Sequence, residues 1–150
     1  MFTEISESQF YTGDPIFRII VNDYPKKFGS LQLSNAAHAL TLCWRGELVA
    51  PVISCDPFSS VVWIGVDQRV TCVAPEGNTL FSVGLSTPLL QIKHFAECTV
   101  VLCETLALAI NRDYTLRRIY DLRELPDTVD IKNSTFTVSF IDGMIEELPI

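Results

Sequence analysis

Apolar and polar residues alternate along much of the chain, which is the pattern of β-strands that bury one face. Between residues 62 and 72 most even positions are apolar and most odd positions are polar. Residues 75–78 (Pro-Glu-Gly-Asn) follow as a turn, in which Gly77 can adopt a positive φ. The alternation resumes over residues 79–85. We therefore predict an antiparallel hairpin in this region.

The same arrangement recurs towards the end of the chain. Residues 99–110 form two apolar runs, residues 111–114 (Asn-Arg-Asp-Tyr) have the composition of a turn, and residues 115–122 alternate again. Residues 135–140 alternate in the same way, and Asp142-Gly143 directly after them is a strong hairpin-turn signal. These segments predict further antiparallel hairpins.

The first third of the chain is less regular. Residues 15–21 predict one strand, and residues 39–44 and 48–54 predict a strand pair around Arg45-Gly46. Pro51 cannot donate a backbone hydrogen bond, so the second strand of this pair should lie at a sheet edge.

Two short helices are weaker alternatives within the same pattern. Ser34 or Asn35 could cap one of them, and Thr87-Pro88 could start the other. β-patterned residues follow both positions closely, which favours strands.

The strand pattern repeats with a period near 39 residues. Ile53, Ile92 and Ile131 fall at this spacing, and a second apolar series at residues 62, 101 and 140 does the same. Self-similarity at 20–50 residues is typical of repeat architectures. We therefore predict a mainly β fold, an antiparallel hairpin or meander repeat in a single domain spanning residues 1–150. Residues 1–50 would form an irregular N-terminal β segment and residues 51–150 the β-repeat region.

The repeat unit resembles a β-propeller blade. The resemblance is carried by Val61-Val62-Trp63-Ile64-Gly65-Val66 followed by the turn segment 74–80, and by residues 99–102 through 111–116. It covers residues 52–122 well and 130–148 partially, and no tryptophan-aspartate ending is present.

Propellers have at least four blades of about 40 residues, whereas this chain offers two full units and a partial third. An open repeat exposes sheet edges, and exposed edges favour pairing with another chain. We therefore expect a homo-oligomer, such as a symmetric dimer.

Composition narrows the classes of function. Apolar residues make up 48% and charged residues 19% of the chain, and the net charge of −7 disfavours nucleic-acid binding. The first residues lack the basic and apolar regions of a signal peptide, and no apolar run reaches membrane-spanning length, so we expect a cytoplasmic protein without membrane contact. Five cysteines, an odd number at irregular spacing, predict reduced and mostly buried thiols.

Signals for catalysis, metals and cofactors are weak. His94, Cys98 and Cys103, with Cys72, lack the paired spacing of zinc ligands. Those thiols show no local context that would activate a nucleophile, and no Gly-x-Gly phosphate loop occurs. We therefore expect no metal, no cofactor and no enzymatic activity.

The leading hypothesis is a non-catalytic, cytosolic protein-interaction module that binds another protein or its own copies. One version is immunity-like, with the acidic surface masking a basic partner. The candidate interface residues are Trp63, Arg118 and Tyr120. Trp63 points away from Ile64 and would be exposed if the sheet were covered on one side only, whereas a strand buried on both faces would hide it.

The alternative is a small-ligand binder or hydrolytic enzyme with a pocket at the hairpin turns. Loops on a rigid β-scaffold often carry such sites. Asp67, His94, Arg112 and Asp113 are the candidate pocket residues. Convergence of these side chains in one concave pocket would favour this alternative.

Overall fold

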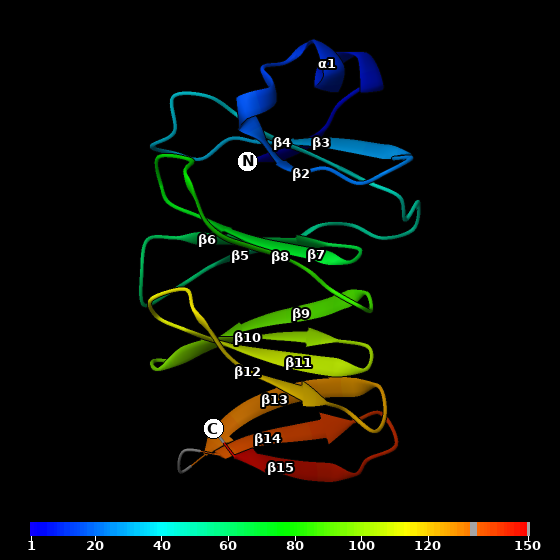
Figure 1. The fold of residues 1–150 in the computed structure, drawn as a ribbon, viewed down its shortest axis with the longest axis vertical. Helices are drawn as coiled ribbons and strands as arrows, with labels where there is room; N and C mark the ends of the chain where they lie inside the picture. The colour runs from blue at the N-terminus through cyan, green and yellow to red at the C-terminus, as the bar shows by residue number, and fades with distance from the viewer. Residues whose placement is uncertain (133–134, 150) are drawn as a thin grey trace. The chain divides into compact units, whose positions relative to one another are not determined.

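The computed structural model describes residues 1–132 and 135–149 and is mainly β, as predicted (Figure 1). Strands account for 53% of residues and helices for 6%. The chain divides into two compact units, Met1–Gly84 and Leu85–Ile150, called unit 1 and unit 2 below. Each unit contains two small sheets that pack face to face.

The first sheet of unit 1 has the order β1-β3-β4-β2. The β2–β4 pair is parallel and the other two pairs are antiparallel. Its strands are β1 (Phe2–Glu4), β2 (Arg18–Ile20), β3 (Lys27–Leu31) and β4 (Leu40–Trp44).

A short helix, α1 (Glu7–Thr12), and a 3₁₀ turn, η1 (Pro15–Phe17), connect β1 to β2. Ser6 and Gln9 form a capping box at the start of α1. At its end the Arg18 guanidinium donates to three backbone carbonyls, those of residues 10, 11 and 13, and its charge lies over the Phe10 ring. Local polar contacts therefore hold this helix, since six residues are too few for a stable isolated helix.

The second sheet of unit 1 is an antiparallel meander of four consecutive strands. They are β5 (Val52–Cys55), β6 (Val62–Val66), β7 (Arg69–Val73) and β8 (Thr79–Gly84). Trp44 and Leu42 from the first sheet share one buried core with Ile64 and Val66 from the second. This core joins the two sheets of unit 1.

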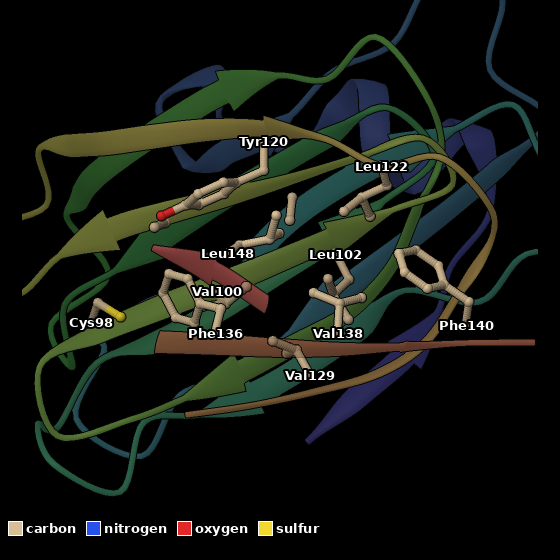
Figure 2. Packing of buried hydrophobic residues seen from close by; sticks show 12 residues of the cluster. Cys98, Val100, Leu102, Tyr120, Leu122, Val129, Phe136, Val138, Phe140 and Leu148 are labelled. Carbon is tan, nitrogen blue, oxygen red and sulfur yellow. The ribbon is translucent and has the colours of Figure 1, made fainter. Parts of the chain in front are cut away.

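Unit 2 consists of two further antiparallel meanders. The first has four strands and the second has three. They are β9 (Leu89–His94), β10 (Cys98–Cys103), β11 (Leu106–Asn111) and β12 (Leu116–Asp121), then β13 (Pro126–Lys132), β14 (Thr135–Phe140) and β15 (Ile145–Pro149). Val100 and Tyr120 from the first sheet face Phe136 and Val138 from the second in a single core (Figure 2).

The repeat is real, but its period is 37 residues in the structure. The strands β5, β9 and β13 begin at residues 52, 89 and 126, which are 37 apart in both steps (89 − 52 and 126 − 89). The five-residue turns 74–78 and 111–115 are also 37 residues apart. Each has the same internal hydrogen bond, in which the N–H of its fourth residue donates to the carbonyl of its first. That fourth residue has positive φ in both, 97° at Gly77 and 64° at Tyr114.

Two expectations for local structure need correction. Residues 39–44 and 48–54 do not pair, because β4 and β5 belong to different sheets. Only residues 18–20 of the segment 15–21 are in a strand, and η1 occupies its first part. The two weaker helix alternatives are not adopted: residues 37–38 form a bend after Asn35, and strand β9 begins at Leu89, directly after Thr87-Pro88. The edge position predicted from Pro51 is confirmed, because β5 is the outermost strand of its sheet.

Candidate interaction surface

Trp63, the first predicted interface residue, lies inside the protein. Its side chain is 1% exposed and its ring lies 5.7 Å from that of Phe81, measured between centroids. Strand β6 is buried on both faces, since Ile64 on the opposite face is also inaccessible. The exposure that an interface role requires is therefore absent at Trp63.

Tyr120, the second, is a core residue with a polar end. Its ring packs edge-to-face on Phe136, and its hydroxyl donates to the carbonyl of Pro149 at 2.6 Å. Burial raises the pKa of this hydroxyl, which keeps it protonated as a donor. Tyr120 thus fastens β12 to β15 across the two sheets of unit 2 and contributes little exposed surface.

Arg118, the third, is exposed on β12 and lies with its guanidinium 5.3 Å from the centre of the Tyr120 ring. Arg117, next to it, is also exposed and is the extra residue of a β-bulge, since Ala109 pairs with Arg118 and Ile110 pairs with Leu116. An Arg117-Arg118 doublet on a central strand would be split between two sides of a sheet. On β12 both side chains reach solvent.

Strand β12 is the outermost strand of its sheet and is exposed along almost its whole length. No described strand pairs with its outer side. Every residue except Tyr120 is exposed, and these include two large apolar side chains, Leu116 and Ile119. The sequence signal for this surface is the segment Leu-Arg-Arg-Ile, which lacks the one-sided alternation of the other strands.

Strand β15 is the outermost strand of the other sheet of unit 2, and it is acidic. Ile145, Glu146 and Glu147 form its first half, and Ile145 is 64% exposed. Further exposed apolar side chains lie in the β14–β15 turn, at Ile141 and Met144. Both edges carry apolar groups together with charges, which are two basic and one acidic (Asp121) on β12 and two acidic on β15.

Asp67, from the predicted pocket, holds a turn and a loop together. It lies in the two-residue β6–β7 turn with a φ of 49°. One carboxylate oxygen accepts the backbone N–H groups of Arg45 at 2.7 Å and of Gly46 at 3.1 Å. These contacts fix the crossing from β4 to β5.

The other three predicted pocket residues belong to unit 2 and are engaged locally. The Arg112 guanidinium donates to the carbonyls of Phe95 and Ala96. His94 Nδ1 lies 3.1 Å from the Thr99 hydroxyl on the neighbouring strand. Hydrogen bonds from the Thr115 hydroxyl and N–H to Asp113 close the β11–β12 turn and lower the pKa of that carboxyl.

Two cavities in unit 1 flank the β7–β8 turn, at a place that the sequence did not indicate. One, of about 350 Å³, is mostly apolar and is lined by Leu31, Ile53 and Val62 with Cys55 and Ser60. The other, of about 190 Å³, carries polar groups and is lined by Phe17, His38, Glu76 and Asn78 among others. The His38 ring stacks on Phe17 at 4.5 Å between centroids. None of the four predicted pocket residues lines either cavity.

The cysteines are mostly buried, as predicted. Cys43, Cys72, Cys98 and Cys103 are buried free thiols and Cys55 is exposed. Burial raises the pKa of all four buried thiols, to about 12 for Cys72 and Cys103. Buried thiols of this kind are poor nucleophiles.

Within residues 1–132 and 135–149, no three side chains of the metal-binding types gather into a group that could hold an ion. No helix in the same residues is long and apolar enough to cross a bilayer. No protein-family model matches the sequence, and no curated protein shows significant similarity to it.

Proposed function

We propose that this protein is a non-catalytic interaction module that binds an extended protein segment along the edge strand β12. The observation that carries the proposal is the exposure of five of the six residues of β12 at an unpaired sheet edge. An edge strand presents a row of backbone donors and acceptors to which an incoming strand can bind.

The side chains of β12 define the chemistry of the bound segment. Arg117 and Arg118 are both exposed and would attract carboxylates of an added strand. Leu116 and Ile119 offer apolar surface on the same strand. An acidic segment rich in β-branched residues fits both features best.

The buried free thiols support a reducing, cytosolic setting for the module. The net charge of −7 supports the immunity-like version, in which a basic partner is masked. In that version the partner would contact the acidic edge β15, with Glu146 and Glu147, because the arginines of β12 repel basic groups.

The proposal can be tested with extended eight-residue peptides displayed on phage against the full chain. We expect enrichment of acidic, β-branched peptides. The variant Arg117→Glu/Arg118→Glu should weaken binding of the best peptide at least tenfold. The matched control Arg45→Glu/Lys132→Glu makes the same change in net charge at exposed positions outside β12 and should bind normally. Peptides that bind both variants equally, or no enrichment, would contradict the proposal.

A small-ligand site is the second candidate, because a cavity with polar groups lies beside the β7–β8 turn, although none of the four predicted pocket residues lines it. His38 and Glu76 both line it and offer a base and an acid. A small polar ligand bound there would raise the midpoint of thermal unfolding, and Glu76→Gln would remove that increase. A panel of metabolites that leaves the midpoint unchanged would argue against this candidate.

A further inference from the structure

The two exposed edge strands of unit 2 lie next to each other. The Tyr120 hydroxyl on β12 donates to Pro149 on β15, and Tyr120 and Leu148 belong to the same core (Figure 2). Each of the two strands is the outermost one of its sheet. One side of unit 2 therefore presents two open edges, one above the other.

These two edges carry opposite charges. Strand β12 ends at the exposed Asp121 but is basic on balance. Its basic side chains are Arg117 and Arg118, and the acidic side chains of β15 are Glu146 and Glu147. None of these four side chains forms an ion pair with a described residue. The chain thus carries both a basic edge and an acidic edge on the same side.

Glu146 provides a second, independent observation. Its side chain is only half-buried, but the atom Oε2 is buried and accepts no hydrogen bond from any described residue. A carboxylate oxygen in this state is costly, because it has lost water without gaining a donor. Because this atom has no accessible surface, a guanidinium from another molecule would supply the missing N–H groups only after the Glu146 side chain had turned outwards from the strand edge.

Resting on the proposed function of β12, we propose that its partner is a second copy of this chain. A two-fold axis between β12 and β15 brings the basic edge of each copy beside the acidic edge of the other. The contact is made twice and is self-complementary, as in most soluble dimers. The exposed Ile119 and Ile145 supply apolar area at the same edges.

The charges select this arrangement over its alternatives. Pairing β12 with β12 would place four arginines together, and pairing β15 with β15 would place four glutamates together, which like-charge repulsion disfavours. The exposed position of the charges implies a dimer that weakens as salt is added. An acidic extended peptide that binds β12 would compete with the dimer.

Reversing the charges of one edge at a time gives the decisive experiment. Sedimentation equilibrium of the full chain at micromolar concentration measures the association. The native chain is expected to form a dimer of twice 16.8 kDa. Arg117→Glu/Arg118→Glu and Glu146→Lys/Glu147→Lys should each raise the dimer Kd at least tenfold. An equimolar mixture of the two variants should dimerise again, because each variant then presents only edges that attract the other. Arg45→Glu/Lys132→Glu serves as the control and should dimerise normally.

The outcomes separate this inference from the proposed function. A native chain that stays monomeric overturns the self-association, and acidic peptides that still bind β12 would leave the proposed function standing. A dimer that survives both charge reversals, or a mixture that fails to reassociate, shows that the contact lies elsewhere and also overturns the inference. Circular dichroism of each variant excludes loss of folding as the cause.

Discussion

Raising the pH from 8 to 11 is expected to lower the free energy of unfolding by about 5 kcal/mol through the two most shifted buried thiols alone. Cys72 and Cys103 have pKa values of about 12 in the folded protein, above the model value of 9.0. The main cause is burial, and Asp56 near Cys72 and Glu104 near Cys103 add to it. The other two buried thiols, Cys43 and Cys98, have raised pKa values as well.

The direction follows from proton binding. Between pH 9 and 12 the unfolded chain has lost thiol protons that the folded chain retains, so the unfolded state binds fewer protons. Stability is therefore fully present below pH 9 and falls above it, by at most about 1.4 kcal/mol per pH unit for each thiol.

Urea denaturation at a series of pH values, with reductant present, measures this slope. Cys72→Ala and Cys103→Ala should each make the slope shallower, even though each also lowers stability at pH 8 through the cavity that it leaves. The exposed Cys55 is the matched control, and Cys55→Ala should leave the slope unchanged. A native slope near zero, or one insensitive to Cys72 and Cys103, would contradict the expectation.

The alternation of apolar and polar residues predicted the meander strands well, including β8 and β12, in which most residues are exposed. The period was less accurate for a physical reason. Ile53, Ile92 and Ile131 are the second, fourth and sixth residues of β5, β9 and β13, so they do not occupy equivalent positions. The turns of the first two units do, because their positive-φ residues, Gly77 and Tyr114, recur at the structural period. Turn geometry is thus a better guide to the repeat than core residues are. An apolar core residue can occupy several different positions in strands of different length.

The segment between β4 and β5 shows where local pattern is insufficient. Two strand-like runs around Arg45-Gly46 resemble a hairpin, but the Trp44 indole donates to the Val49 carbonyl at 2.8 Å and Asp67 binds the loop backbone. These contacts direct the chain from one sheet to the next. Both involve residues whose role depends on tertiary neighbours, so alternation could not reveal them.

The candidate surface was only partly predictable. Arg118 was identified, whereas Trp63 was misplaced because alternation reports one face of a strand and cannot show whether the other is covered. Arg117 was not among the predicted interface residues, because alternation within one strand does not show that the strand lies at a sheet edge or that a β-bulge interrupts it at this residue.

Replacing Asp67 with alanine is expected to lower the free energy of unfolding by about 2–4 kcal/mol. The carboxylate accepts two backbone N–H groups, which alanine would leave without their acceptor. Alanine would also have to adopt the φ of 49°, where a side chain without local hydrogen bonding is strained. The Asp67 carboxylate lies close to the loop backbone, since a Cβ built at Gly46 would be 2.6 Å from it.

Asp67→Asn is the matched control because asparagine tolerates positive φ and keeps one acceptor oxygen while removing the charge. We expect it to lose about half as much stability as the alanine variant, and both losses can be read from urea denaturation at pH 7. The pair also separates the structural interpretation of Asp67 from the pocket hypothesis. If Asp67 served a ligand site instead, Asp67→Ala would unfold at the native urea concentration while losing ligand binding. A destabilised alanine variant with an intermediate asparagine variant would establish Asp67 as the group that fixes the β4–β5 crossing.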